Sequence, residues 1–188
     1  RTMRVYHQGY ALPFAFANGS RDYLGYNSLE GIAMQLGSQA ALLDPPRSGP
    51  NAHHVDRAYQ FFRYFVNGGR DLDMRRLDVT AEGPQRARIL EISALFDATA
   101  TDLSAFAARG GKMIWLHGHD DPSVSPLENR RNVQAITQRM GRAATDGFLR
   151  YHEIPGLAHG GGRFAPMLES LSALDAWVEQ GRAPEGLV

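Results

Sequence analysis

Two short apolar runs, each ending in a polar loop, set the strongest constraint on how this chain folds. The first is Lys112-Met-Ile-Trp-Leu-His-Gly-His-Asp-Asp-Pro122, and the second begins at Phe148 and ends in Ile154-Pro-Gly-Leu-Ala-His-Gly160. A helical pattern lies between them. Strand, helix and strand in this order predict two parallel strands joined by a helical crossover. Because the carboxyl ends of parallel strands meet at one edge of a sheet, Asp121 and His159 are expected to lie close together.

An aspartate and a histidine at one sheet edge are two of the groups that acyl transfer through a serine requires. The histidine takes the proton of the nucleophile, and the carboxylate fixes the imidazole tautomer. The alternative is structural: Asp121 would be a turn residue before Pro122, and His159 a loop histidine beside glycines. Asp120 competes as the acid, and the unused carboxylate would be a cap or a surface group. We predict Asp121 as the acid, four residues after His117, and His159 as the base.

The chain divides at about residue 100. Residues 1–100 are aromatic and mostly helical in pattern, whereas residues 101–188 alternate strand and helix. The patterns predict strands over 112–117 and 148–154, and helices over 27–43, 55–66, 126–140 and 164–180. A further helix is expected to start near Pro84, and a short helix, capped by Thr101 or Asp102, is expected to end at Ala108. The apolar side of the helix from Pro84 consists of Ile89, Ile92, Leu95 and Phe96. The side of the last helix expected to face the sheet consists of Met167, Leu168, Leu171, Leu174, Trp177 and Val178.

Composition excludes several classes of partner and chemistry. Lys+Arg and Asp+Glu balance at 20 each, and basic patches with interleaved aromatics are missing, so neither nucleic acid nor a membrane surface is an expected partner. No apolar run has the length of a membrane span. Cysteine is absent, which excludes disulfides, thiolate metal sites and a cysteine nucleophile within this sequence.

Five motifs in residues 101–188 follow the pattern of one family. They are Asp102-Leu-Ser-Ala-Phe106, Arg109-Gly-Gly-Lys112, His117-Gly-His-Asp-Asp-Pro122, Ile154-Pro-Gly-Leu-Ala-His159 and Ala176-Trp-Val-Glu-Gln-Gly-Arg-Ala-Pro184. This part of the chain resembles the tannase and feruloyl esterase family of α/β-hydrolases. Residues 61–66 and Gly19-Ser20 resemble, more loosely, the lid region of that family.

The resemblance implies an α/β fold: residues 101–188 would be the C-terminal half of an α/β-hydrolase sheet, and residues 1–100 part of a mostly helical lid. It also implies a secreted or periplasmic serine esterase that cleaves small aromatic-acid esters of the gallate or hydroxycinnamate type. Asp121 would then be the acid of the catalytic triad, and His159 its base.

The sequence departs from the family at the nucleophile. The family's histidine is normally followed by a cysteine, disulfide-bonded to a cysteine beside the nucleophile, but here Gly160 takes that place. The elbow Gly-x-Ser-x-Gly is absent from all 188 residues, and Ser20, Ser38 and Ser48 do not lie in a strand-to-helix turn. The serine and oxyanion hole are therefore expected on a preceding segment or a partner chain. The family's lid calcium site would also lie upstream, so we assign no cofactor and no metal to this chain.

Two other functions compete with this interpretation. His117, His119 and Asp121 partly match the zinc motif His-x-His-x-Asp-His of metallo-β-lactamase-like hydrolases, but Pro122 stands where the last histidine belongs. We expect His117 to be structural and His119 to line a pocket or face solvent.

The chain would instead be catalytically silent if it were a fragment or subunit acting as a structural or binding partner. Loss of a triad nucleophile removes catalysis on the order of a millionfold. A half-sheet would also leave an open edge and exposed apolar helix faces. We therefore expect the chain to be stable only beside an N-terminal partner.

Overall fold

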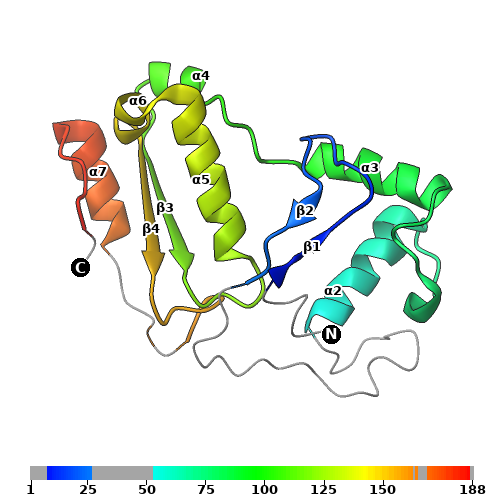
Figure 1. The fold of residues 1–188 in the computed structure, drawn as a ribbon. Coiled ribbons are helices and arrows are strands. Elements are labelled where there is room, and N and C mark those ends of the chain that lie inside the picture. Colours follow the sequence, from blue (N-terminus) through cyan, green and yellow to red (C-terminus); the bar gives the residue numbers. More distant parts are fainter. Residues whose placement is uncertain (1–7, 27–52, 163, 165–168, 187–188) are drawn as a thin grey trace. The chain divides into compact units, whose positions relative to one another are not determined.

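The computed structural model describes residues 8–26, 53–162, 164 and 169–186 (Figure 1). The helix predicted over 27–43 lies outside the described residues. Two compact units are formed. One contains the described residues of the segments Arg1–Tyr10, Tyr23–Ile32 and Thr99–Val188, and the other those of Ala11–Asp22 and Ala33–Ala98. Two segments from the first 100 residues thus cluster with the later part of the chain.

The second of these units is built mainly from helices. Helix α2 (His53–Phe61) continues into the π-helical turn η2 (Phe62–Val66), the 3-10 turn η3 (Met74–Arg76) follows, and α3 spans Pro84–Phe96. The π-helical turn lies within the helix predicted over 55–66. Tyr59 is buried, and its hydroxyl donates to Asp71 Oδ1 over 2.6 Å. Phe65 meets Phe96 edge to face, with ring centroids 5.2 Å apart.

The predicted apolar side of α3 is only half correct. Ile89 and Ile92 are buried, but Leu95 is 74% exposed and Phe96 58%. An α-helix turns by about 100° per residue, which places Leu95 well to one side of the stripe through residues 89, 92 and 96. Phe96 lies on the stripe but is the last residue of the helix.

Strands β1 (Tyr10–Ala11) and β2 (Asp22–Tyr23) form a two-stranded hairpin near the start of the chain. The rings of Tyr10 and Tyr23 stack across it at 5.7 Å. Gly9 precedes the hairpin with φ +70, and a Cβ atom there would overlap Tyr23 O. Glycine is thus required where the two backbones approach this closely.

Residues 99–188 form the predicted α/β arrangement. In chain order they contain α4 (Ser104–Ala108), β3 (Met113–Gly118), α5 (Pro126–Met140), α6 (Arg142–Asp146), β4 (Leu149–Ile154) and α7 (Ser170–Gln180). Strands β3 and β4 are parallel, and Met113 pairs with Leu149, Trp115 with Tyr151 and His117 with Glu153. The helical crossover and the parallel pairing are both as predicted (Figure 1). The short helix α6 was not predicted.

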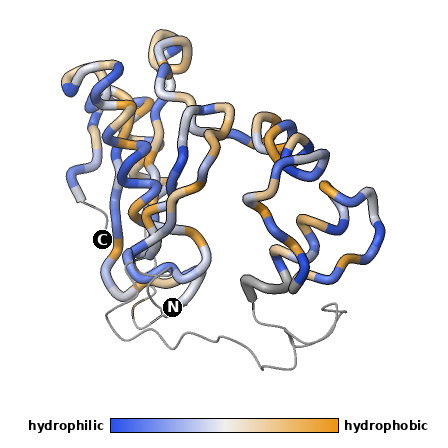
Figure 2. The backbone as a smooth tube through the Cα atoms, turned by 45° about the vertical axis from the view of Figure 1, so that its right-hand side comes forward, coloured by the Kyte–Doolittle hydropathy of each residue, from blue (hydrophilic) through white to orange (hydrophobic). Residues whose placement is uncertain are grey.

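A core forms between α5 and one face of the two strands. Ile136 on α5 packs with Phe148 and Leu149, and Met113, Trp115 and Val133 border this cluster. Hydrophobic residues are interspersed with hydrophilic ones along the helices (Figure 2), and none of the described helices has the length and apolar character needed to cross a membrane.

Helix α7 lies against the opposite face of the strands. The guanidinium of Arg150 on β4 lies 4.9 Å from the centroid of the buried Trp177 ring. The predicted sheet-facing side was wrong at Leu171 and Val178, which are 79% and 53% exposed. Both lie about 100° or more around the helix from Trp177, which faces the sheet as predicted and contacts Arg150. The helix also begins later than predicted, at Ser170, and residues 165–168 lie outside the described residues.

Candidate active site

The loop after β3 fixes the carboxylate of Asp121. Its Oδ1 accepts backbone N–H groups from Ser123 at 2.7 Å and from Val124 at 2.9 Å. Pro122 has no N–H, so the next two residues supply the donors. The Asp121 side chain is only 5% exposed. Two amides thus hold one oxygen, and the other oxygen is directed at the neighbouring loop.

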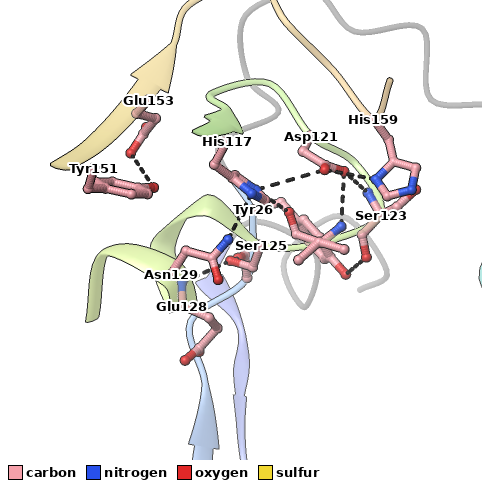
Figure 3. Close-up of polar contacts among 12 residues, drawn as sticks. Tyr26, His117, Asp121, Ser123, Ser125, Glu128, Asn129, Tyr151, Glu153 and His159 are labelled. Carbon is pink, nitrogen blue, oxygen red and sulfur yellow. Dashed lines mark hydrogen bonds and ion pairs between the residues drawn. The ribbon is translucent and has the colours of Figure 1, made fainter. Parts of the chain in front are cut away.

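The loop after β4 brings His159 to that second oxygen. His159 Nδ1 lies 2.9 Å from Asp121 Oδ2 (Figure 3). A carboxylate only accepts hydrogen bonds, so Nδ1 carries the hydrogen and Nε2 keeps a lone pair for a substrate or nucleophile proton. The His159 side chain is 58% exposed, unlike that of Asp121. The structure therefore brings together the two residues that the sequence singled out.

Gly118 allows the two loops to approach each other. A Cβ atom there would lie 2.4 Å from Leu157 O and 2.8 Å from Ala158 O. Directly after it, the N–H of His119 donates to Ile154 O, and the N–H of Asp120 donates to Leu157 O, both over 3.0 Å. These bonds join the acid loop to the histidine loop.

The histidine loop is closed by its own glycines. Gly156 and Gly162 have φ values of +78 and +133. Ala158 N–H donates to Gly161 O over 2.5 Å, and Phe164 N–H donates to Gly156 O over 3.1 Å. Positive φ at the glycines lets the chain reverse around His159 within a few residues.

Asp120 is not the surface carboxylate that one alternative expected. It is 7% exposed, so the structure buries both neighbouring aspartates. Of the two, Asp121 contacts the histidine. Asp120 contributes its backbone N–H to the junction of the loops.

His119 is bound to a charged cluster on β4 and α5. Its Nδ1 lies 2.5 Å from Glu153 Oε1, and Arg130 donates to both carboxylate oxygens of Glu153. Burial alone would raise the pKa of Glu153, but the hydrogen bonds from Arg130 and His119 hold it below its usual value. The expectation that His119 faces solvent or lines a pocket is thus only partly met, because its side chain is 32% exposed but paired.

The zinc alternative gains no support from this arrangement. Both ring nitrogens of His117 have protein partners, Val124 O and Asn129 Nδ2. Across the part of the chain that the structure describes, no three His, Asp or Glu side chains gather in a group that could hold a metal ion.

A segment from the start of the chain is attached to the acid loop and α5. Leu24 N–H donates to Glu128 Oε1 over 2.7 Å, and the Ser125 hydroxyl donates to Gly25 O. The Tyr26 hydroxyl donates to Ser123 O over 3.3 Å, and burial raises the pKa of Tyr26 (Figure 3). Sequence reasoning missed these contacts and Asn129. Ser125 caps α5 by accepting the N–H of Glu128. Nothing local in the sequence marks the other residues.

Comparison with known proteins gives consistent matches. The profile of the family described as tannase and feruloyl esterase matches residues 1–188. An uncharacterized esterase of Agrobacterium fabrum is 50% identical over the whole chain, which covers 34% of that relative. A mono(2-hydroxyethyl) terephthalate hydrolase of Piscinibacter sakaiensis is 43% identical over 47% of the chain and 14% of its own length.

The fold has solved counterparts as well. The crystal structure of feruloyl esterase B from Aspergillus oryzae superposes on 98% of the chain with a TM-score of 0.65 and 24% identity, and the match covers 36% of that protein. The fold is accordingly a partial α/β-hydrolase domain, as predicted. The chain spans about a third of the length of the Agrobacterium relative and of this solved structure.

Proposed function

The chain belongs to the tannase and feruloyl esterase family, and on that premise we propose that it supplies the acid and base of a serine esterase. The observation that carries the proposal is the 2.9 Å contact between Asp121 Oδ2 and His159 Nδ1. The contact leaves His159 Nε2 as a base on an exposed ring. Asp121, held by two amides, orients the ring and stabilises its positive charge.

The reaction is acyl transfer through a serine. The hydroxyl oxygen attacks the ester carbonyl while His159 Nε2 takes its proton. The tetrahedral intermediate collapses, the imidazolium gives that proton to the leaving alcohol, and an acyl-enzyme remains. Water then repeats both steps and releases the acid. A protonated His159 cannot accept the serine proton, so the rate should fall on acidification. A rate that is flat from acid to alkaline pH would contradict His159 as the base.

The nucleophile lies on a preceding segment or a partner chain. Within the described residues, no hydroxyl is hydrogen-bonded to His159. Strand β3 pairs only with β4 among the described strands, so its other edge is open for further strands. The same segment or partner chain would cover the exposed Leu171 and Val178 on α7. The preceding segment or partner chain would also carry the oxyanion hole.

Aromatic-acid esters of the gallate or hydroxycinnamate type are the proposed substrates. The support is the family and the name of the Piscinibacter relative, whose substrate is also an aromatic-acid ester. The test uses the complete esterase, meaning this chain together with the preceding segment or partner chain that carries the serine. Methyl gallate and methyl ferulate should be cleaved with a higher kcat/KM than methyl cyclohexanecarboxylate, a control of similar size without an aromatic ring. Equal values would contradict the aromatic preference.

A catalytically silent subunit is the second candidate, because no triad serine is bound to His159 within the described residues. Hydrolysis of methyl gallate by the isolated 188-residue chain, compared with the complete protein, separates the possibilities. We expect activity only in the complete protein. A silent complete protein would support the subunit function, and an isolated chain as fast as the complete protein would falsify the external serine.

Export and a reaction that does not use zinc complete the proposal. A secreted or periplasmic location follows from the family, and cell fractionation tests it.

The esterase should keep its activity in 1,10-phenanthroline, which removes zinc, because acyl transfer through Asp121 and His159 uses no metal. Loss of activity in the chelator would favour a metal-dependent reaction.

A further inference from the structure

His117 forms a second contact network on the acid loop. It lies near the carboxyl end of β3, and its side chain is 10% exposed. Nε2 lies 3.1 Å from Val124 O and 3.8 Å from Asp121 Oδ2, while Nδ1 lies 2.8 Å from Nδ2 of Asn129 on α5 (Figure 3). The ring therefore connects helix α5 with the loop that carries Asp121.

These partners determine which ring nitrogen carries the hydrogen. Val124 O is a carbonyl oxygen and can only accept, so Nε2 of His117 must be protonated. In the neutral ring Nδ1 then has a lone pair and requires a donor. The amide nitrogen of Asn129 is that donor at 2.8 Å. Both contacts therefore favour the same neutral tautomer of His117, with the hydrogen on Nε2 and the lone pair on Nδ1.

The backbone of Val124 links the tautomer of His117 to the position of the Asp121 carboxylate. Its carbonyl accepts from His117, and its N–H donates to Asp121 Oδ1 over 2.9 Å. In the other tautomer the Nε2 lone pair would face Val124 O and Asp121 Oδ2, two acceptors. Repulsion would then move the acid loop away from the position in which Asp121 meets His159.

We propose that Asn129 and His117 are positioning residues, Asn129 selecting the Nε2–H tautomer of His117 and His117 thereby holding the Val124 peptide and Asp121 in the catalytic geometry. This inference rests on the proposed esterase function. Neither residue touches the reacting atoms. The pair explains why a polar asparagine of α5 points at the end of β3.

Two substitutions of His117 separate positioning from general stability. The amide nitrogen of His117→Gln can reach approximately the place of Nε2, whereas that of His117→Asn reaches only the place of Nδ1. Measured on the complete esterase, we expect kcat of His117→Gln to stay within about threefold of wild type and that of His117→Asn to fall roughly tenfold, with KM little changed. Equal kcat values for the two variants, whether high or low, would overturn the inference.

Asn129→Asp tests the tautomer directly and keeps the side-chain shape. An aspartate accepts at Nδ1, so it favours a hydrogen there and opposes the native tautomer. Nitrogen-15 NMR of histidine-labelled protein should show wild-type His117 with an unprotonated Nδ1 and protonated Nε2, and Asn129→Asp should change that pattern and lower kcat. A wild-type ring protonated at Nδ1 would overturn the inference.

Asn132→Asp is the matched control, since it makes the same change on the same helix, and the hydrogen bonds of His117 go to Val124 and Asn129. It should leave both the spectrum and kcat unchanged. If Asn132→Asp lowered kcat as much as Asn129→Asp, the effect would be one of helix charge and the inference would fail. A wild-type protein that lacks esterase activity would instead refute the proposed function, and the NMR spectrum would still report the tautomer.

Discussion

Gly118 lies so close to Leu157 that a Cβ atom on it would fall 2.4 Å from the Leu157 carbonyl oxygen. The contact joins the end of β3 to the loop after β4. The hydrogen bonds of His119 and Asp120 across the same junction depend on that approach. The spacing of the strand tips, and with it the meeting of Asp121 and His159, thus depends on the absence of one methyl group.

Gly118→Ala should therefore damage both stability and activity. The neighbouring atoms are backbone and cannot rotate away, so overpacking should cost about 1–3 kcal/mol of unfolding free energy. The displaced loops should also lower kcat. Thermal melting and ester hydrolysis measure the two effects. Gly161→Ala is the matched control in the histidine loop, because a Cβ atom there meets nothing within 4 Å. Equal losses in the two variants would contradict the close-contact argument.

Asp121→Asn should leave the fold intact and abolish most of the activity. The amide oxygen can still accept the N–H groups of Ser123 and Val124, but an amide nitrogen facing His159 favours the wrong tautomer. In a serine triad this change lowers kcat by about 10⁴-fold. Asp120→Asn serves as the control, since Asp120 is equally buried but does not contact His159. We expect it to keep kcat within a few-fold, and a comparable loss there would weaken the assignment of the acid.

The sequence predicted the parts of the site that periodicity and chain order determine. Strand, helix and strand place Asp121 and His159 at one sheet edge, and the structure has them in contact. The two amides that hold Asp121 were not predictable, because any residue other than proline provides an N–H. Asn129 was missed because its partner lies on another element. The orientation of α7 was only partly predicted because its apolar residues cover a broad arc, and the contacts of Arg150 and Lys112 with the Trp177 ring select one side of it.

Glu153→Gln should reduce stability at neutral pH, and the loss should disappear in acid. Burial raises the pKa of Glu153, but the bonds from Arg130 and His119 outweigh it and keep the pKa below the ordinary 4.5. The ionised carboxylate therefore stabilises the fold above about pH 4.5, and this contribution is lost as the pH falls through the folded pKa. Melting temperatures of both proteins at pH 7 and pH 3.5 test this.

The control for Glu153 is Glu91→Gln. Glu91 is 61% exposed and pairs with Arg88 on the same helix, a surface pair that contributes little. Its melting temperature should follow the wild type at both pH values. A Glu153→Gln deficit that is the same at pH 7 and pH 3.5 would show that the side chain acts through packing rather than charge.

His152 should make the fold sensitive to mild acid. Burial, assisted by the charge of Arg150, lowers the pKa of His152 below the ordinary 6.5. The unfolded chain then binds a proton more readily than the folded one, so stability falls as the pH drops below about 6.5. Within the described residues, Nε2 of His152 is also buried without a hydrogen-bond partner. An apolar replacement removes both penalties.

Two variants of His152 separate these penalties. His152→Leu should be more stable than wild type at pH 7.5, on the order of 1 kcal/mol, and the gain should grow as the pH falls to about 5.5. His152→Gln also loses the titrating group but keeps a buried polar group. The stability of His152→Gln should therefore depend on pH as weakly as that of His152→Leu, but His152→Gln should not be more stable than wild type at pH 7.5. Melting curves in which both variants keep the wild-type pH dependence would place the acid sensitivity elsewhere, because neither replacement can take up a proton at this position.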